Sequence, residues 1–253
     1  MLRSKRVALI ALVLLLANVA AANAQETALP DEQVKERLAF IAKALEDGQP
    51  GARRWWYGWI AGYSAGAVTM GVLAATNWET APDIQTFAPV PEPDNSFAQD
   101  MLVGSATFAL GVAGLLIDPF TPARAATKLR PLPETSAAER LAKLKRAEEL
   151  LRESARREKS GRSLSTHLLN AGVNAAAGVV TVVAFDRPAT DGLVTFAIGE
   201  AISLLNIFSQ PMRATRDLKK YEAGYPAAAA PAAPRATWSL SVRPGGLSFR
   251  LQF

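Results

Sequence analysis

Hydrophobic and polar positions follow one another in blocks along this chain, and most blocks have the period of an α-helix. The first block covers residues 31 to 47, where acidic residues begin the segment and the sequence Gly48-Gln49-Pro50 follows it. The pattern predicts a short amphipathic helix that ends before Pro50. Its apolar positions at helical spacing are Val34, Leu38, Ile41, Ala42 and Leu45.

Four later segments contain almost no charge: residues 55 to 76, 101 to 117, 168 to 185 and 192 to 208. The one charged residue in them is Glu200. Because the first segment is about 22 residues long, it would span roughly 33 Å as a helix, which is enough for a bilayer. The other three, at about 17 to 18 residues, are near the lower limit for spanning. We expect four transmembrane helices; the alternative is the apolar core of a soluble α-bundle.

The segment 136 to 160 has a different pattern. Ser136 and Glu139 have the spacing of a capping box, and a narrow apolar stripe runs among many Arg, Lys and Glu residues. We predict a solvated connecting helix with one apolar face. The stripe consists of Leu141, Leu144, Ala147 and Leu151.

The C-terminal region combines a stiff Pro- and Ala-rich linker with two short alternating segments on either side of Pro244-Gly245-Gly246. The alternation predicts a β-hairpin. Terminal strands of outer-membrane barrels also end on an aromatic residue such as Phe253, but two strands cannot close a barrel. We therefore expect a small hairpin that covers the helical body or extends a neighbouring sheet.

An internal duplication is indicated by two ungapped alignments. PARAATKL at 122 to 129 matches PMRATRDL at 211 to 218, and GYSAGAVTMGVLA from Gly62 matches GVNAAAGVVTVVA from Gly172. The alternative is that helices rich in small residues look alike. The duplication predicts a mainly α fold: a four-helix bundle of two duplicated helical hairpins, with an amphipathic connecting helix and a small C-terminal β-hairpin.

These segments divide the chain into seven parts. They are a signal peptide (1 to 24), an N-terminal amphipathic helix (25 to 52), a first helical hairpin (53 to 130), a basic helix (131 to 166), a second helical hairpin (167 to 222), a linker (223 to 236) and the β-hairpin (237 to 253).

The first 24 residues have the composition of an export signal. Three basic residues precede an apolar run, and Ala22-Asn23-Ala24 has the small-x-small pattern of a cleavage site. The alternative is an uncleaved anchor. We expect an exported bacterial cell-envelope protein associated with a membrane, the inner in preference to the outer, with the periplasm as the alternative.

The loop charges conflict with this signal. Residues 77 to 100 carry five acidic and no basic residues, whereas 119 to 166 carry twelve basic against six acidic. Basic loops of inner-membrane proteins face the cytoplasm, but a cleaved signal would place residues 119 to 166 outside. Either the N-terminal segment is not a cleaved signal, or the hairpins enter from the outer side, or they pack within a soluble bundle or oligomer.

Small residues recur every fourth position in the first hairpin, which allows two helix backbones to approach closely in lipid. We predict helix packing through these residues, within the chain or between copies. They are Gly58, Gly62, Gly66, Ser105, Ala109 and Ala113.

Glu200 is the principal candidate for chemistry, because an ionisable side chain within a membrane helix marks a functional site by default. Asn170 and Asn174, four residues apart on the preceding segment, could meet it across the second hairpin. The alternative is a carboxyl group that only fixes the helix register.

Basic and aromatic residues at the ends of the hairpins are typical of a membrane interface. We predict contacts with lipid headgroups or the interface for Arg53, Arg54, Trp55, Trp56, Arg124 and Arg213.

Composition excludes several kinds of site. The 253 residues include no cysteine and one histidine, His167, so thiolate metal sites and multi-histidine sites are excluded. Removing Arg3, Lys5 and Arg6 leaves 25 basic against 23 acidic residues, +2, which gives no reason to expect a nucleic-acid partner. We expect no metal or cofactor.

No phosphate-binding loop or nucleophile motif supports an enzyme. The sequence therefore favours a non-enzymatic envelope protein with a structural or scaffolding role, whose partners are membrane lipid and either a second copy or an envelope protein. Two alternatives are a channel or transporter component that uses Glu200 and a soluble periplasmic helical binding protein.

Overall fold

A computed structural model describes residues 29–80, 94–226, 237–243 and 246–252. The predicted signal peptide and most of the linker lie outside the described residues. The described part is mainly helical. Its helices are α2 (Asp31–Thr76), α3 (Ser96–Ile117), the short 3-10 helix η1 (Thr121–Ala123), α4 (Ala125–Leu129), α5 (Ala137–Ser160), α6 (Leu164–Ala184), α7 (Ala189–Ser209) and α8 (Arg213–Gly224).

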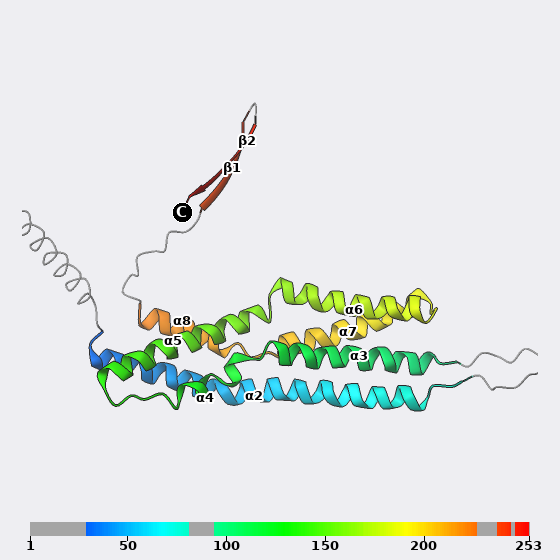
Figure 1. Cartoon of the computed structure of the whole chain (residues 1–253), viewed down its shortest axis with the longest axis horizontal. Coiled ribbons are helices and arrows are strands. Elements are labelled where there is room, and N and C mark those ends of the chain that lie inside the picture. Colours follow the sequence, from blue (N-terminus) through cyan, green and yellow to red (C-terminus); the bar gives the residue numbers. More distant parts are fainter. Residues whose placement is uncertain (1–28, 81–93, 227–236, 244–245, 253) are drawn as a thin grey trace, which may run out of the picture.

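The helices form an elongated body with two unlike ends (Figure 1). At one end α3, α6, α7 and the second half of α2 run side by side, and we call this part the rod (residues 55–76, 96–117, 164–184 and 189–209). At the other end the first half of α2 packs with η1, α4, α5 and α8. We call this part the head (residues 31–54, 118–163 and 210–226).

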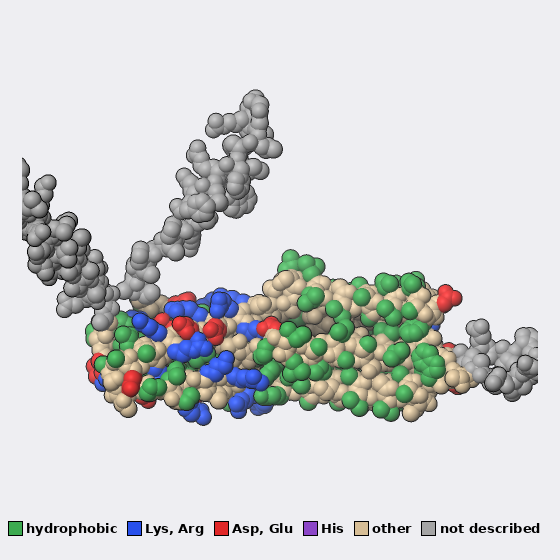
Figure 2. Space-filling view, in the orientation of Figure 1, with side chains coloured by type: hydrophobic (Ala, Val, Ile, Leu, Met, Phe, Trp, Pro, Cys, Tyr) green, Lys and Arg blue, Asp and Glu red, His purple; other side chains and the backbone are tan. Residues whose placement is uncertain are grey.

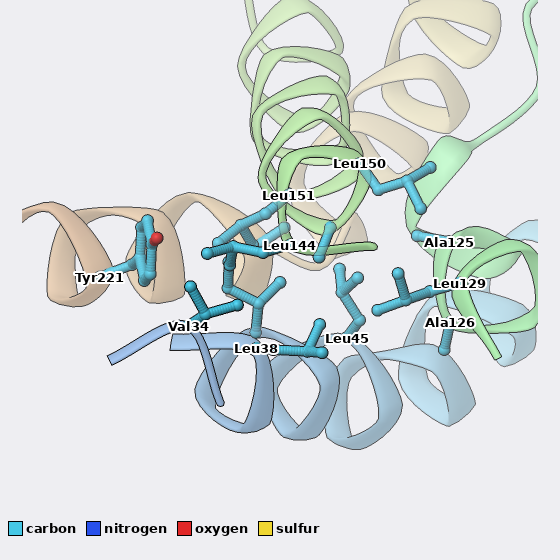
Figure 3. Packing of buried hydrophobic residues seen from close by; sticks show 13 residues of the cluster. Val34, Leu38, Leu45, Ala125, Ala126, Leu129, Leu144, Leu150, Leu151 and Tyr221 are labelled. Atoms are coloured by element: carbon cyan, nitrogen blue, oxygen red, sulfur yellow. The ribbon is translucent and has the colours of Figure 1, made fainter. Parts of the chain in front are cut away.

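The head has a hydrophobic core built from the apolar stripes that the sequence predicts. The stripe of α2 lies against the stripe of α5, while α4 and α8 close the cluster from either side (Figure 3). Ile41, Ala147 and Leu150 are fully buried there. The other members are Val34, Leu38, Leu45, Ala125, Ala126, Leu129, Leu144, Leu151, Ala214 and Tyr221.

The capping box at the start of α5 is confirmed. The Glu139 N–H donates to Ser136 Oγ at 3.2 Å, and the Ser136 N–H donates to Glu139 Oε2 at 3.0 Å. Two backbone groups at the helix terminus are thereby satisfied, so α5 begins where the sequence places it.

The predicted helix end at residues 48 to 50 is wrong, because α2 is a single helix of 46 residues that contains Pro50 and ends at Thr76. A proline in a helix interior costs about 3 kcal/mol. Burial on both sides offsets this cost here: Leu45 and Ala52 are 5% and 1% exposed. In addition, Gln49 Nε2 and Arg53 Nε each donate to the Ala123 carbonyl at 3.2 Å. Tertiary contacts therefore hold the helix through its proline.

The rod contains four helices that are long and apolar enough to cross a membrane. α3, α6 and α7 have 22, 21 and 21 residues, longer than the charge-poor segments because flanking polar residues continue each helix. At 1.5 Å per residue each is about 32 Å long, which matches the hydrocarbon thickness of a bilayer. α2 pairs with α3 and α6 pairs with α7, and the two hairpins touch through α3 and α6.

The apolar side chains of the rod face outward. Only 6% to 17% of the residues in the most apolar stretch of each candidate span are buried. Figure 2 shows hydrophobic side chains spread over the rod, whereas basic and acidic side chains gather on the head. An exposed apolar surface of this extent indicates membrane association.

The two segments of the proposed duplication that follow the hairpins have similar burial. Ala125 and Ala126 in the first segment align with Ala214 and Thr215 in the second, and all four are buried against the head. This agreement concerns one short segment, and the duplication remains a prediction.

Two strands pair near the C-terminus. β1 (Thr237–Arg243) and β2 (Gly246–Gln252) are antiparallel, with Trp238 opposite Leu251 and Leu240 opposite Phe249. Their side chains lie outside those that the structure describes. The structure thus supports a mainly helical fold, and the predicted hairpin that covers the helical body stays a prediction.

Candidate functional site

The interior of the α6–α7 hairpin contains a small polar cluster. Asn174 is 2% exposed, and its Nδ2 donates to Glu200 Oε2 at 3.0 Å and to Ser203 Oγ at 3.1 Å. Gly199 makes room for the amide, because a Cβ there would lie 2.5 Å from Asn174 Oδ1. The two helices thus meet around one amide side chain.

The structure brings together two of the three residues predicted to form this cluster. Asn174 reaches Glu200 across the hairpin, whereas Asn170 lies one turn away and is not among the hydrogen-bond partners of Glu200 in the described part of the chain. Glu200 itself is half-buried. A carboxylate in hydrocarbon is costly, and a single amide donor offsets only part of that cost.

Closer to the end of the rod farthest from the head, the α6–α7 hairpin contains a direct backbone contact. A Cβ on Gly178 would lie 2.5 Å from the Gly192 carbonyl oxygen, and one on Gly192 would lie 2.7 Å from the Gly178 carbonyl oxygen. Close approach of two glycines is how helices pack in lipid. The sequence analysis missed this pair because the two residues lie on different helices and share no repeat.

The α2–α3 hairpin packs by a different arrangement, in which side chains of one helix fill spaces left by glycines of the other. Phe108 lies over Gly66, and Tyr63 lies over Gly111. Their rings are 5.5 Å apart in an edge-on contact. Added Cβ atoms at these glycines would lie 3.1 Å and 2.9 Å from the covering rings, so neither position has room for a larger side chain.

Ser105 also belongs to this contact. Its Oγ donates to the Ala67 carbonyl at 2.8 Å and lies opposite Gly71. Ala113 is half-buried, whereas Ala109 is exposed. Of the predicted α3 residues, Ser105 therefore makes the clearest contact with α2.

Gly58 and Gly62 do not take part in packing within the chain, in contrast to Gly66. Both are exposed, and a Cβ at either position would meet no described atom within 4 Å. They share the spacing of Gly66 but lie nearer the head, where this face of α2 is uncovered. A contact through this face requires a second molecule or lipid.

The predicted interfacial residues lie where the rod meets the head. Trp56 is 1% exposed, and its Nε1 donates to the Leu115 carbonyl at 3.1 Å. The Arg124 guanidinium stacks on Trp56 with its Cζ 4.7 Å from the ring centroid. Trp55 Nε1 donates to Ser209 Oγ at 3.1 Å. The two tryptophans thereby join α2 to the ends of α3 and α7.

Arg213, like the buried Trp55 and Trp56, has its contacts within the protein. Its Nη2 lies 3.0 Å from Asp47 Oδ2, and its Nε lies 3.2 Å from Asp217 Oδ2. The first pair joins α8 to α2 inside the head, and the second lies within α8. Arg213 therefore has partners within the protein, and the lipid contact predicted for it has no support from its surroundings.

A buried carboxylate that the sequence analysis missed joins the connecting helices. Glu158 is 1% exposed, and its two carboxylate oxygens accept the backbone N–H groups of Ala214 and Thr215 at 2.9 Å and 2.7 Å. It thus caps the first turn of α8 from another helix. Burial raises the pKa of Glu158. A carboxylate in a charged segment gives no sequence signal that distinguishes it from its solvated neighbours.

The two hairpins are also linked at the end of the rod farthest from the head. Arg187, which precedes α7, lies 2.6 Å from Asp191 and 3.3 Å from Asp100 of α3. Its Nη1 also donates to the Ser96 carbonyl at 3.1 Å. This clasp complements the tryptophan contacts near the head, so the hairpins are held together at both ends.

The described residues include acidic side chains and the single histidine, which are the potential metal ligands of this chain. They contain no group of three or more His, Cys, Asp or Glu side chains that could hold a metal ion. His167 lies in the first turn of α6, with its ring 6.0 Å from that of Phe208. The contacts described above are those of helix packing, with one polar cluster between α6 and α7.

Comparison with known proteins adds no relative: no protein-family model, curated protein or solved structure matches this chain.

Proposed function

We propose that this chain is a non-enzymatic membrane protein of the bacterial cell envelope with a structural or scaffolding role, which it performs by associating with further copies through the rod. The observation that carries the proposal is the outward face of the four apolar helices, in which so few side chains are buried by the chain itself. Lipid and neighbouring rods are the surroundings that suit such a surface.

The open face of α2 is the part of this surface best suited to a second helix. Gly58 and Gly62 leave the backbone uncovered. Because lipid tails are as apolar as the helices, close backbone contact is a main source of helix association in membranes. The Phe108 ring fills the space beside Gly66, so association between copies would use Gly58 and Gly62 alone.

The test is the double substitution G58L/G62L. No described atom lies within 4 Å of an added Cβ at either position, so we expect an unchanged fold and a loss of association between copies. Cross-linking in native membranes and sedimentation in detergent would measure association, and the thermal unfolding midpoint would measure the fold.

The matched control is G114L/G172L, because those glycines also have no described atom within 4 Å of an added Cβ and lie on other helices. The control should associate like the wild type. Unchanged cross-linking of G58L/G62L, or an equal loss in the control, would contradict association through α2.

We infer that the rod inserts into the inner membrane. The side on which the head lies then defines the orientation of the whole chain. Residues 31–54 and 118–163 lie at the same end of the molecule, so one measurement places both (Figure 1). The chain has no cysteine, which allows single-cysteine labelling. Lys145→Cys in the head and Thr190→Cys at the opposite end should react from opposite sides of the membrane. Labelling of both from the same side would contradict a spanning rod.

The polar cluster of α6 and α7 favours a second candidate function, a channel or transporter component in which Glu200 binds a proton or a cation. Its support is the contact of Glu200 with buried Asn174. In that case E200Q abolishes a flux measured in vesicles and leaves the unfolding midpoint unchanged. A shifted midpoint without any effect on flux would instead assign Glu200 to helix packing.

A soluble periplasmic bundle fits the arrangement less well. Such a protein buries its apolar segments beneath polar helices, whereas Val183 and Ile117 of the rod are 75% and 83% exposed. Polar helices cover the head and not the rod (Figure 2). Recovery of the protein from the periplasmic fraction without detergent would support this alternative.

A further inference from the structure

We propose that four arginines at the boundary between rod and head form a binding surface for the headgroups of anionic phospholipids. They are Arg53, Arg54, Arg124 and Arg162, and we call them the arginine collar. The proposal rests on the membrane insertion included in the proposed function. It adds the class of lipid that the protein selects.

The first three collar residues lie next to the tryptophans of α2, either in the sequence or by stacking. Arg53 and Arg54 directly precede Trp55, and Arg124 stacks on Trp56. Trp56 Nε1 donates to the carbonyl of Leu115 near the end of α3. The start of the rod part of α2 therefore lies beside the end of α3. The guanidinium groups therefore lie where the apolar surface of the first hairpin stops.

Arg162 occupies the corresponding place on the second hairpin. Its Nη2 donates to the Phe208 carbonyl at 2.9 Å and to the Gln210 carbonyl at 2.8 Å, at the end of α7. The bond from Trp55 Nε1 to Ser209 Oγ brings this end of α7 to the level of the first three arginines. The collar thus extends over both hairpins.

The collar differs from the head in how its charge is compensated. In the head, Arg140 pairs with Asp31 at 2.7 Å and Lys143 pairs with Glu134 at 2.8 Å. In the described part of the chain, no carboxylate lies within 4.0 Å of a collar arginine. Carbonyl oxygens and a tryptophan ring position Arg53, Arg124 and Arg162 but do not neutralise them, and the Arg54 side chain is exposed. The collar therefore keeps its positive charge for an external anion.

The apolar surface begins directly beside the collar. Ile117 at the end of α3, Leu164 at the start of α6 and Phe208 at the end of α7 are 83%, 73% and 63% exposed. A partner that contacts both surfaces needs an anionic group attached to an apolar chain. A phospholipid has this composition, and arginine binds phosphate with paired donors. A soluble polyanion would leave the apolar residues uncovered.

The test uses the full chain reconstituted in vesicles that contain phosphatidylglycerol and phosphatidylcholine in equal amounts, with bromine on the acyl chains of one lipid at a time. Bromine quenches tryptophan fluorescence at short range. Trp55 and Trp56 are buried, so half-buried Trp59 is the reporter beside the collar, and every variant carries W78F/W238F to remove the tryptophans elsewhere. The ratio of quenching by the two brominated lipids reports which lipid is enriched there.

We expect brominated phosphatidylglycerol to quench more strongly in the wild type. R54Q/R124Q removes two exposed charges and keeps the hydrogen bonds of Arg53 and Arg162. Its preference for the anionic lipid should fall by about fivefold or more, the factor corresponding to one basic residue at an anionic surface. R54K/R124K, which keeps the charge, should retain most of the preference.

The matched control is K219Q/K220Q, which removes two exposed charges from α8 in the head. Its preference should equal that of the wild type. Equal quenching by both lipids in the wild type, an unchanged preference in R54Q/R124Q, or an equal loss in the control would overturn the proposal. Absence of quenching by either lipid would instead contradict membrane insertion itself, so the two failures are distinguishable.

Discussion

The head and the rod expose opposite kinds of residue, although both are helical and belong to one chain. In the head, leucines such as Leu150 are fully buried and charged residues cover the surface. In the rod, Leu110 and Val183 are 58% and 75% exposed, while Asn174 is 2% exposed and lies inside. The rod thus differs from the head in its apolar outer surface, while its interior contains apolar residues such as Val103 and Ile207 as well as Asn174.

The difference shows which force acts in each part. Burial of apolar area from water holds the head together. Where the outer surface is apolar, this force does not distinguish the inside from the outside. Close backbone contact and hydrogen bonds between side chains then hold the helices. Gly178 and Asn174 are the corresponding residues in the α6–α7 hairpin.

α2 contains both arrangements in a single helix. Its first half buries Val34 and Leu38 in the head, and its second half exposes Val68 and Val72 on the rod. The change occurs at Trp55 and Trp56. A rigid helix that crosses the boundary fixes the position of the head relative to the rod, because no loop separates them there.

The largest expected effect comes from comparing a buried leucine of the head with an exposed leucine of the rod. Leu150→Ala in the head should reduce the free energy of unfolding by about 3 kcal/mol, because it leaves a cavity at a fully buried site. Leu110→Ala in the rod should cost less than about 1 kcal/mol, since lipid or detergent fills the space. Thermal unfolding in detergent measures both. Equal losses would mean that Leu110 packs against protein.

The helices of the head and rod were predictable because their patterns are strong. Charge-free segments and an amphipathic stripe identify helices in any solvent, and Ser136 with Glu139 marks a terminus. The end of α2 was not predictable from its sequence. Pro50 is a local stop signal, and contacts with Ala123, more than 70 residues away, overcome it.

The candidate site was predictable in part. Helical spacing and composition single out Glu200 and Asn174, and the structure places them in contact. The same reasoning misses the pairing of Gly178 with Gly192, which depends on the relative position of two helices. It also gives Gly58, Gly62 and Gly66 equal weight, although only Gly66 contacts the next helix. Spacing defines a face, and the neighbouring helix decides whether that face is covered.

The second prediction tests close backbone contact in the rod. Gly178→Ala would place a Cβ 2.5 Å from the Gly192 carbonyl oxygen, so α6 and α7 must separate. Overpacking of this kind costs about 1 to 3 kcal/mol. Gly172→Ala is the matched control on the same helix, since no described atom lies within 4 Å of its Cβ. Both variants gain the same helix propensity, so the difference between their unfolding midpoints isolates the contact. Identical midpoints would contradict a tight α6–α7 interface.

The smallest expected effect concerns Glu158, which at 1% exposed is more deeply buried than the other buried charges of the head, Lys143 and Asp217. Burial is the main cause that raises its pKa, and nearby Asp217 acts in the same direction. The N–H groups of Ala214 and Thr215, at the positive end of the α8 dipole, act in the opposite direction. The net result is a carboxyl group that binds its proton more tightly in the folded chain than in the unfolded chain.

The sign of the pH dependence follows from linkage. Below the pKa of an unfolded glutamate, about 4.3, both states are protonated and Glu158 imposes no charge-burial penalty. As the pH rises through the raised pKa of the folded state, the unfolded chain ionises first and the folded chain loses relative stability. The side chain of E158Q cannot ionise. Its weaker cap on α8 shifts the unfolding midpoint by an amount that does not change with pH. The unfolding midpoint of the wild type relative to E158Q should therefore fall as the pH rises above about 4.3. A relative midpoint that rises instead would show that the two backbone N–H groups stabilise the charge more than burial penalises it.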